Sequence, residues 1–129
     1  MSLEPGDRAL FLRRALRKRC PQCGNGALFR GFARLNDGCP SCALVFRRES
    51  GSQTGAMYVS AVVTEMAAMA MALAMYFFTD WSTPVALTVG TLFILVFSYL
   101  FLPVAMACWT AVEYATDVAN AEKWVQPRR

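Results

Sequence analysis

The sequence contains no histidine. Without an imidazole, neither a Ser-His nor a Cys-His catalytic pair can form. The chain also lacks a glycine-rich phosphate-binding loop and any evident pair of carboxylates placed to act as an acid and a base. These absences predict that the protein is not an enzyme.

Charge is almost missing from the middle of the chain, where Glu65 and Asp80 are the only charged residues between positions 56 and 112. A helix needs about 20 apolar residues to cross the roughly 30 Å of hydrocarbon in a bilayer. The sequence therefore predicts two transmembrane helices in an antiparallel hairpin, because the turn between them is short. The predicted segments are residues 55–78, the turn 79–83, and residues 84–108. A soluble protein of 129 residues could not cover two such helices.

The first 55 residues are strongly basic, with ten Lys and Arg side chains against four Asp and Glu, a balance of +6. The predicted turn holds one acid and no base. Because loops rich in Lys and Arg stay in the cytoplasm, we expect both termini there and the turn in the periplasm. Residues 1–20 lack the apolar core of a cleavable signal peptide. The tail, residues 109–129, is expected to lie at the cytoplasmic interface.

Four cysteines form two C-x-x-C pairs in this basic head. They are Cys20, Cys23, Cys39 and Cys42, spaced C-x2-C-x15-C-x2-C. Two residues between cysteines let a tight turn direct both sulfurs at one ion, and Zn²⁺ takes four thiolates in a tetrahedron. We therefore predict a zinc site in a zinc-ribbon-like β module over residues 19–50, with Phe29 and Phe32 as a miniature core. So small a core would need the metal in order to fold.

Other uses of the four thiols stay open. Iron in a rubredoxin-like site uses similar knuckles, and the thiols could also transfer a metal or electrons. Stable disulfides are not expected in a reducing cytoplasm. Ala43 follows the second knuckle where glycine is usual, and a left-handed alanine there would cost on the order of 1 kcal/mol.

Three stretches together resemble a known family. They are "RCPQCGNGALFRGF", "CPSCALVF" and "GAMYVS". In their order and spacing, over roughly residues 13 to 118, the chain resembles the bacterial family called domain of unknown function 983. The resemblance implies a cytoplasmic zinc-ribbon-like head and about two helices in the bacterial cytoplasmic (inner) membrane, with no assigned activity. Some genes of this family lie near those for haem-copper oxidase assembly, which makes respiratory oxidase assembly one role that the resemblance suggests.

The N-terminal segment, residues 1–18, is basic and amphipathic. One helical arc carries Arg13, Arg14, Arg17 and Lys18, and the other carries Ala9, Leu12, Ala15 and Leu16. We expect the four basic residues to contact anionic lipid headgroups. The alternative is a basic run that only directs topology. Nucleic acid is not an expected partner, because the membrane accounts for the charge and no exposed aromatic row accompanies it.

Glu65 falls near the middle of the first span, where a carboxylate facing lipid is costly. We expect it to face a protein partner or a water pocket, or to be protonated, and the candidate partners within the hairpin are Thr88, Thr91, Ser98 and Tyr99. The expected protein partners are another membrane protein or a second copy of the chain. The predicted fold class is a mainly α membrane protein, a two-helix transmembrane hairpin with a small N-terminal zinc-ribbon-like β module. The predicted function is that of a docking, accessory or assembly subunit of a larger membrane complex. The alternative is metal transfer or thiol redox chemistry by the four paired cysteines.

Overall fold

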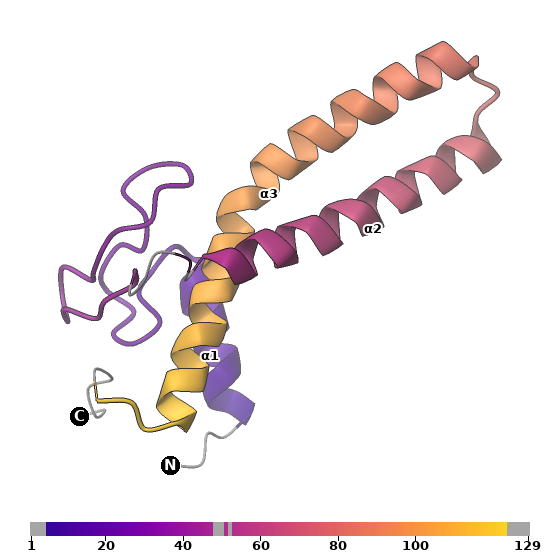
Figure 1. Ribbon diagram of the computed structural model, residues 1–129. Coiled ribbons are helices and arrows are strands. Elements are labelled where there is room, and N and C mark those ends of the chain that lie inside the picture. Colours follow the sequence, from indigo (N-terminus) through magenta and orange to yellow (C-terminus); the bar gives the residue numbers. More distant parts are fainter. Residues whose placement is uncertain (1–4, 48–50, 52, 124–129) are drawn as a thin grey trace.

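The computed structural model describes residues 5–47, 51 and 53–123 as three helices and an irregular head (Figure 1). The helices are α1 (Pro5–Leu16), α2 (Thr54–Phe78) and α3 (Thr83–Ala119). The mainly helical character is therefore confirmed. Within the described residues no β-strand forms, and three isolated antiparallel bridges stand where the β module was predicted: Arg19–Ala27, Phe29–Leu35 and Gly38–Val45.

Helices α2 and α3 form a hairpin, and both are long and apolar enough to cross a membrane. Thr79 ends α2 in an extended conformation, with its backbone N–H and its hydroxyl both donating to the Met75 carbonyl at 3.1 and 2.6 Å. Ser82 is extended as well, and Pro84 lies in the first turn of α3, where its missing N–H removes no helical bond. The connection is therefore four residues long, and both ends of the hairpin lie on one side (Figure 1).

Helix α3 has two halves with different surroundings. No residue from 83 to 102 is buried, whereas seven residues from Pro103 onward are. They are Pro103, Ala105, Ala107, Thr110, Ala111, Tyr114 and Val118. Pro103 lies inside the helix, where a proline lacks its N–H and crowds the carbonyl four residues earlier, and α3 changes direction in this region (Figure 1). The helix continues past residue 108 to Ala119, and its second half is the scaffold of the head.

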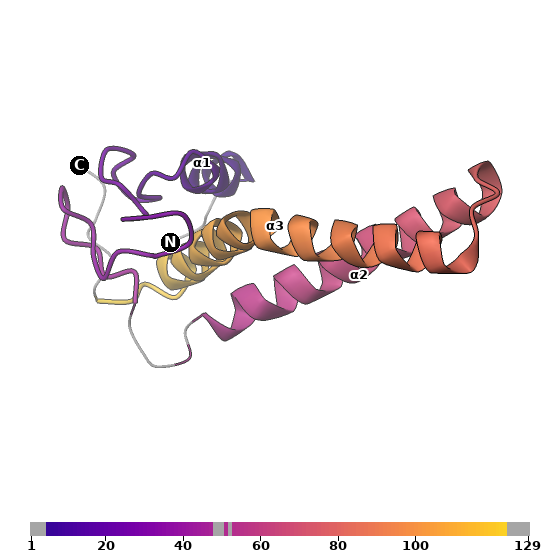
Figure 2. The ribbon, with the colours of Figure 1, turned by 90° about the horizontal axis from the view of Figure 1, so that it is seen from above.

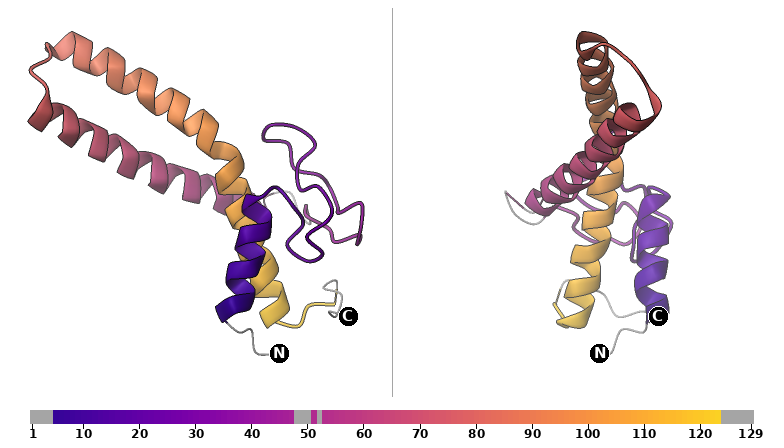
Figure 3. Two further views of the ribbon diagram at one scale, coloured as in Figure 1. Left: turned by 180° about the vertical axis from the view of Figure 1, so that it is seen from behind. Right: turned by 90° about the vertical axis from the view of Figure 1, so that its right-hand side faces the viewer.

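Helix α1 packs antiparallel to this second half of α3, so the start of α1 and the end of α3 lie at the same end of the molecule (Figures 1 and 3). The helix α1 and the start of α2 lie on opposite sides of α3 (Figures 2 and 3). Apolar head residues complete the core, namely Leu28, Phe29, Leu35, Leu44 and Phe46. The core of the protein is thus in the head, and the hairpin beyond it has almost no buried side chains.

Two apolar expectations need correction. The apolar arc of the N-terminal segment does not face a single environment. Ala15 is buried in the core beside Phe11, while Leu12 and Leu16 remain exposed. Phe32 was expected in the core but lies outside it. Its side chain is 43% exposed and stacks on the ring of Tyr99, with ring centroids 4.8 Å apart. The core of the head is larger than predicted, because Phe29 belongs to one buried cluster with residues of α1 and α3.

Candidate metal centre

The end of α1 delivers the chain to the first cysteine. Lys18 adopts a left-handed conformation with φ of 60°, and its N–H donates to the Ala15 carbonyl at 2.8 Å. The N–H of Arg19 reaches back to the Arg14 carbonyl at 3.0 Å. This pair of bonds is a Schellman motif, which usually has glycine at the left-handed position. Lys18 therefore lies beyond the helix and does not continue the basic arc, and the turn leads directly into Cys20.

Two similar turns hold the four cysteines. In the first, the Gly24 N–H donates to the Cys20 carbonyl at 2.9 Å, and the Cys20 N–H donates to Gly26 at 2.8 Å. In the second, the Ala43 N–H donates to the Cys39 carbonyl at 2.9 Å, and the Cys39 N–H donates to Leu44 at 2.8 Å. Each knuckle thus closes on itself through its own backbone.

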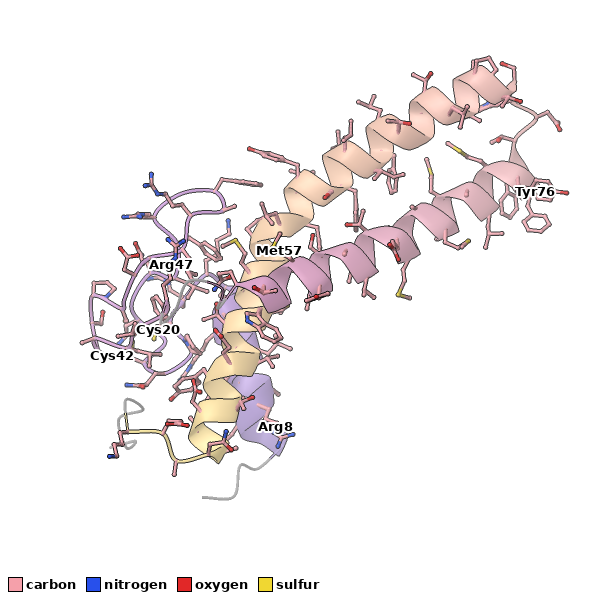
Figure 4. The ribbon with its side chains drawn as sticks, in the orientation of Figure 1. Arg8, Cys20, Cys42, Arg47, Met57 and Tyr76 are labelled. Carbon is pink, nitrogen blue, oxygen red and sulfur yellow. The ribbon has the colours of Figure 1, made fainter. Side chains whose placement is uncertain are left out.

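The two knuckles bring their sulfurs together. All four Sγ atoms lie within 4.8 Å of one another, with Cys20 to Cys42 at 3.7 Å and Cys23 to Cys39 at 3.6 Å. Four sulfurs placed tetrahedrally at about 2.3 Å from one Zn²⁺ would be about 3.8 Å apart. A disulfide requires about 2.05 Å, and all five cysteines are free. The cluster therefore has the dimensions of a tetrathiolate metal site and could hold one ion (Figure 4).

The thiols differ in their exposure and acidity. Burial raises the pKa of Cys20, which is fully buried, and raises the pKa of Cys42 to about 11. At Cys23 burial also raises the pKa, but hydrogen bonds from the backbone amides of Gly26 and Asn25 outweigh it and bring the pKa to about 7. A bound metal requires thiolates, so it must displace protons from Cys20 and Cys42 at neutral pH.

Backbone conformation around the cysteines leaves little space. Gly24 has φ of 74°, and Ala43, at the equivalent position of the second knuckle, has φ of 58°. Ala43 therefore adopts the left-handed conformation whose cost was considered above. A Cβ added to Gly26 would overlap the Sγ of Cys39 and lie 3.2 Å from Pro40. Glycine at this position lets the two knuckles approach each other closely enough to share an ion.

Arginines brace the first knuckle, a role that the basic pattern of the sequence did not reveal. The Arg14 guanidinium donates to the carbonyls of Pro21 and Gln22 at 3.2 and 2.9 Å. The Arg19 guanidinium donates to the Asn25 carbonyl at 2.8 Å. Sequence spacing identified the ligands but contained no signal for these contacts, because they depend on how α1 lies against the knuckle.

Of the remaining predicted site residues, Arg13 and Arg17 lie near the first knuckle, and Glu65 lies apart from the cysteines. Arg13 and Arg17 are exposed near the end of α1, and Glu65 is exposed on α2 within the hairpin. Figure 4 places Cys20 and Cys42 together in the head, with Met57 where α2 begins and Tyr76 at the distant end of the hairpin. The structure therefore separates the cysteine cluster in the head from Glu65 in the apolar hairpin.

Comparison with known families identifies the family of the chain. The family model described as Protein of unknown function (DUF983) matches residues 29–114, which is more than half of the chain, and the chain belongs to this family. The matched region includes the second knuckle, both apolar helices and the head-packing half of α3 as far as Tyr114. Comparison with curated proteins and with solved structures finds no match.

Proposed function

We propose that the protein is a membrane-anchored docking module, whose metal-stabilised head presents a binding surface to another membrane protein. The observation that carries this proposal is the four-sulfur cluster, which lies in a head built on α1 and the second half of α3. Because α3 is continuous from the hairpin into the head core, a partner held by the head is held at a fixed place beside the membrane.

We propose zinc as the metal and a zinc-ribbon-like arrangement for the head. The all-thiolate ligand set, the sulfur separations and the two matching knuckles support this assignment. Iron uses the same ligands, and the two metals are told apart by elemental analysis of protein purified under reducing conditions. About one zinc per chain is expected, and its loss in Cys42→Ser would assign it to this cluster. Absence of both metals would refute the metal-centre proposal.

We propose that the hairpin spans a bacterial cytoplasmic membrane with both termini in the cytoplasm. The basic head and the absence of Lys and Arg from the turn favour this orientation. The test is labelling of intact cells with a membrane-impermeant maleimide. Ser82 is exposed in the turn, so Ser82→Cys should be labelled while the native chain, with its five cysteines, is not. Labelling of the native chain equal to that of Ser82→Cys would overturn the orientation.

The docking role is tested by purifying the full chain from mild detergent and identifying co-purifying proteins by mass spectrometry. Cys20→Ser/Cys23→Ser should lose the partner while the hairpin stays in the membrane, and Cys108→Ser, outside the cluster, should retain it. Retention of every partner by the double variant would show that the head does not dock. A haem-copper oxidase is one complex to look for, given the family resemblance.

A second function is metal transfer or thiol redox chemistry. The observation that favours it is the uneven burial of the cluster, in which Cys20 and Cys39 are buried but Cys23 and Cys42 are partly exposed. An exposed edge gives an incoming ligand or thiol access to the ion. A docking module holds its metal against a mild chelator for hours, whereas a carrier releases it within minutes. We propose no catalytic role in either case.

A further inference from the structure

A cavity of about 660 Å³ lies beside the first knuckle, between the end of α1 and residues 23–25. We call it the arginine pocket, because four of its lining residues are arginines and none is acidic. The arginines are Arg13, Arg14, Arg17 and Arg19. Helical periodicity groups Lys18 with the first three, but the turn at the end of α1 brings Arg19 to the pocket.

Two of these guanidinium groups are held in place by the knuckle itself. Arg14 donates to the carbonyls of Pro21 and Gln22, and Arg19 donates to that of Asn25. A Cβ on Gly24 would lie 3.1 Å from the Arg14 Nε, so the glycine backbone lets this guanidinium lie close to the turn. Fixing the side chains in the free protein reduces the entropy that a ligand must overcome on binding.

The other two arginines have their hydrogen-bonding capacity available. Arg13 and Arg17 are exposed and form no side-chain hydrogen bond or ion pair with any described residue. Four guanidinium groups surround the pocket, and a zinc tetrathiolate beside it contributes a charge of about −2. The arginines are therefore not neutralised by the metal centre, and about two positive charges remain for an anionic ligand.

The pocket lies close to the level at which lipid headgroups would be found. Phe11 is beside Tyr114, and α1 runs antiparallel to α3. Arg17 is six residues beyond Phe11, so in the antiparallel pair it lies level with about position 108 of α3, six residues before Tyr114. Position 108 is five residues from Pro103, where the exposed apolar half of α3 ends. At about 1.5 Å per residue the separation is about 8 Å, comparable with the 5–8 Å thickness of a headgroup layer.

We propose that the arginine pocket binds the phosphate group of an anionic ligand at the membrane surface, and that it does so only when the cysteine cluster holds its metal. Planar guanidinium groups match phosphate oxygens with paired hydrogen bonds. Cys23 lines the pocket, and the carbonyls that position Arg14 and Arg19 belong to the metal-binding turn. Metal binding orders that turn and so forms the pocket, which couples the two sites reciprocally.

The test uses full-length, metal-loaded protein in an uncharged detergent and two probes, inorganic phosphate and short-chain phosphatidylglycerol, measured by titration calorimetry. Phosphatidylcholine of the same chain length is the zwitterionic control. Arg13→Gln/Arg17→Gln removes two pocket charges without touching the knuckle contacts. Arg34→Gln/Arg47→Gln removes two exposed charges elsewhere in the head and is the matched control. The metal content of every variant is measured, so that loss of the metal centre is distinguished from loss of the anion site.

We expect one phosphatidylglycerol per chain, weakened on the order of tenfold or more in Arg13→Gln/Arg17→Gln and nearly unchanged in the control pair. Cys42→Ser, whose side chain does not line the pocket, should lose the metal and the lipid together. Binding of inorganic phosphate with the same variant pattern, and no binding of the lipid, would assign the site to a soluble phosphate compound. Equal weakening in both double variants, binding of neither probe, or undiminished binding by metal-free protein would overturn the proposal.

Discussion

The rings of Phe11 and Tyr114 meet edge to face, with centroids 4.8 Å apart and an interplanar angle of 78°. Both side chains are almost fully buried, at 1% and 2% exposure. Their contact fastens α1 to the second half of α3, and α1 in turn carries the arginines that brace the first knuckle. The position of the cysteine cluster relative to the hairpin therefore depends on this aromatic pair.

Phe11→Ala should loosen the head by about 3–5 kcal/mol, the usual cost of removing a buried phenyl ring. Trypsin cleavage at the basic residues of the head reports the open population, and it should accelerate strongly in this variant. Leu12→Ala is the control, because Leu12 is 39% exposed on the adjacent position of the same helix. Equal cleavage rates for the two variants would mean that the Phe11–Tyr114 contact does not hold the head together.

Gly26→Ala should disturb the metal site without altering any ligand. Its Cβ would overlap the Cys39 Sγ, and the neighbouring Pro40 ring limits how far the second knuckle can retreat. We expect substantially less than one metal ion per chain after dialysis against a weak chelator. Gly31→Ala is the matched substitution in the same head, because its Cβ would meet only the Arg34 side chain at an ordinary 3.7 Å. Full metal content in both variants would contradict the predicted overlap.

Ala43→Gly should stabilise the second knuckle. Ala43 has φ of 58°, a conformation that costs an L-residue about 1–2 kcal/mol. Glycine removes this strain but gains conformational freedom in the unfolded chain, so the net gain should be about 1 kcal/mol or less. Metal release to excess chelator should slow by up to about fivefold, whereas Gly24→Ala, at φ of 74° and against Arg14, should accelerate it. Faster release from Ala43→Gly would show that the strain is relieved in some other way.

The sequence was sufficient for the features that depend on local spacing. The C-x-x-C pairs predicted the cysteine cluster, and their spacing singled out Ala43 as the position where a left-handed residue would carry strain. The sequence did not predict that α3 consists of an exposed apolar half and a second half that packs in the head. Half of the six buried residues after Pro103 are alanines, namely Ala105, Ala107 and Ala111. A stretch of small apolar residues looks the same in sequence whether it faces lipid or a protein core.

The docking of α1 was missed for a related reason. An apolar arc on a short helix shows that something covers it, but lipid and the second half of α3 satisfy it equally well. Phe32 likewise looked like a partner for Phe29, yet it reaches Tyr99, a residue 67 positions away in the chain. The arginine pocket depends on two placements that the sequence did not predict: the packing of α1 on α3 and the packing of the first knuckle against α1.

Gly55→Ala should weaken the junction between the hairpin and the head. An added Cβ would overlap the indole ring of Trp109, which packs directly on the first turn of α2. We expect a lower midpoint of thermal unfolding in detergent and a change in tryptophan emission. Gly90→Ala is the matched control on α3, because a Cβ there would meet nothing within 4 Å. If the two variants unfold at the same temperature, the Gly55–Trp109 contact does not determine the stability of the hairpin.

Glu65 is exposed on α2, so the hairpin itself does not bury it. It lies nine residues beyond Ala56, the buried residue that marks the head end of α2, or about 13 Å along the helix. In a spanning hairpin this depth is near the middle of the hydrocarbon, where a carboxyl group facing lipid is costly. We therefore predict that the carboxyl group faces a partner protein or a second copy of the chain.

Glu65→Gln keeps hydrogen-bonding capacity and should leave both abundance and co-purifying proteins nearly unchanged. Glu65→Leu removes the polar cost in lipid, so its abundance should be equal or higher, but it should lose the partner. Met66→Leu, at a neighbouring position that is 68% exposed, is the control for a change of shape on the apolar surface. Affinity purification with quantitative mass spectrometry measures all three variants. If Glu65→Leu retained every partner and the same native mass, Glu65 would have no part in assembly. The leucine variant is the decisive one, because it removes the hydrogen-bonding group that an interhelical contact requires and that a merely tolerated polar residue does not.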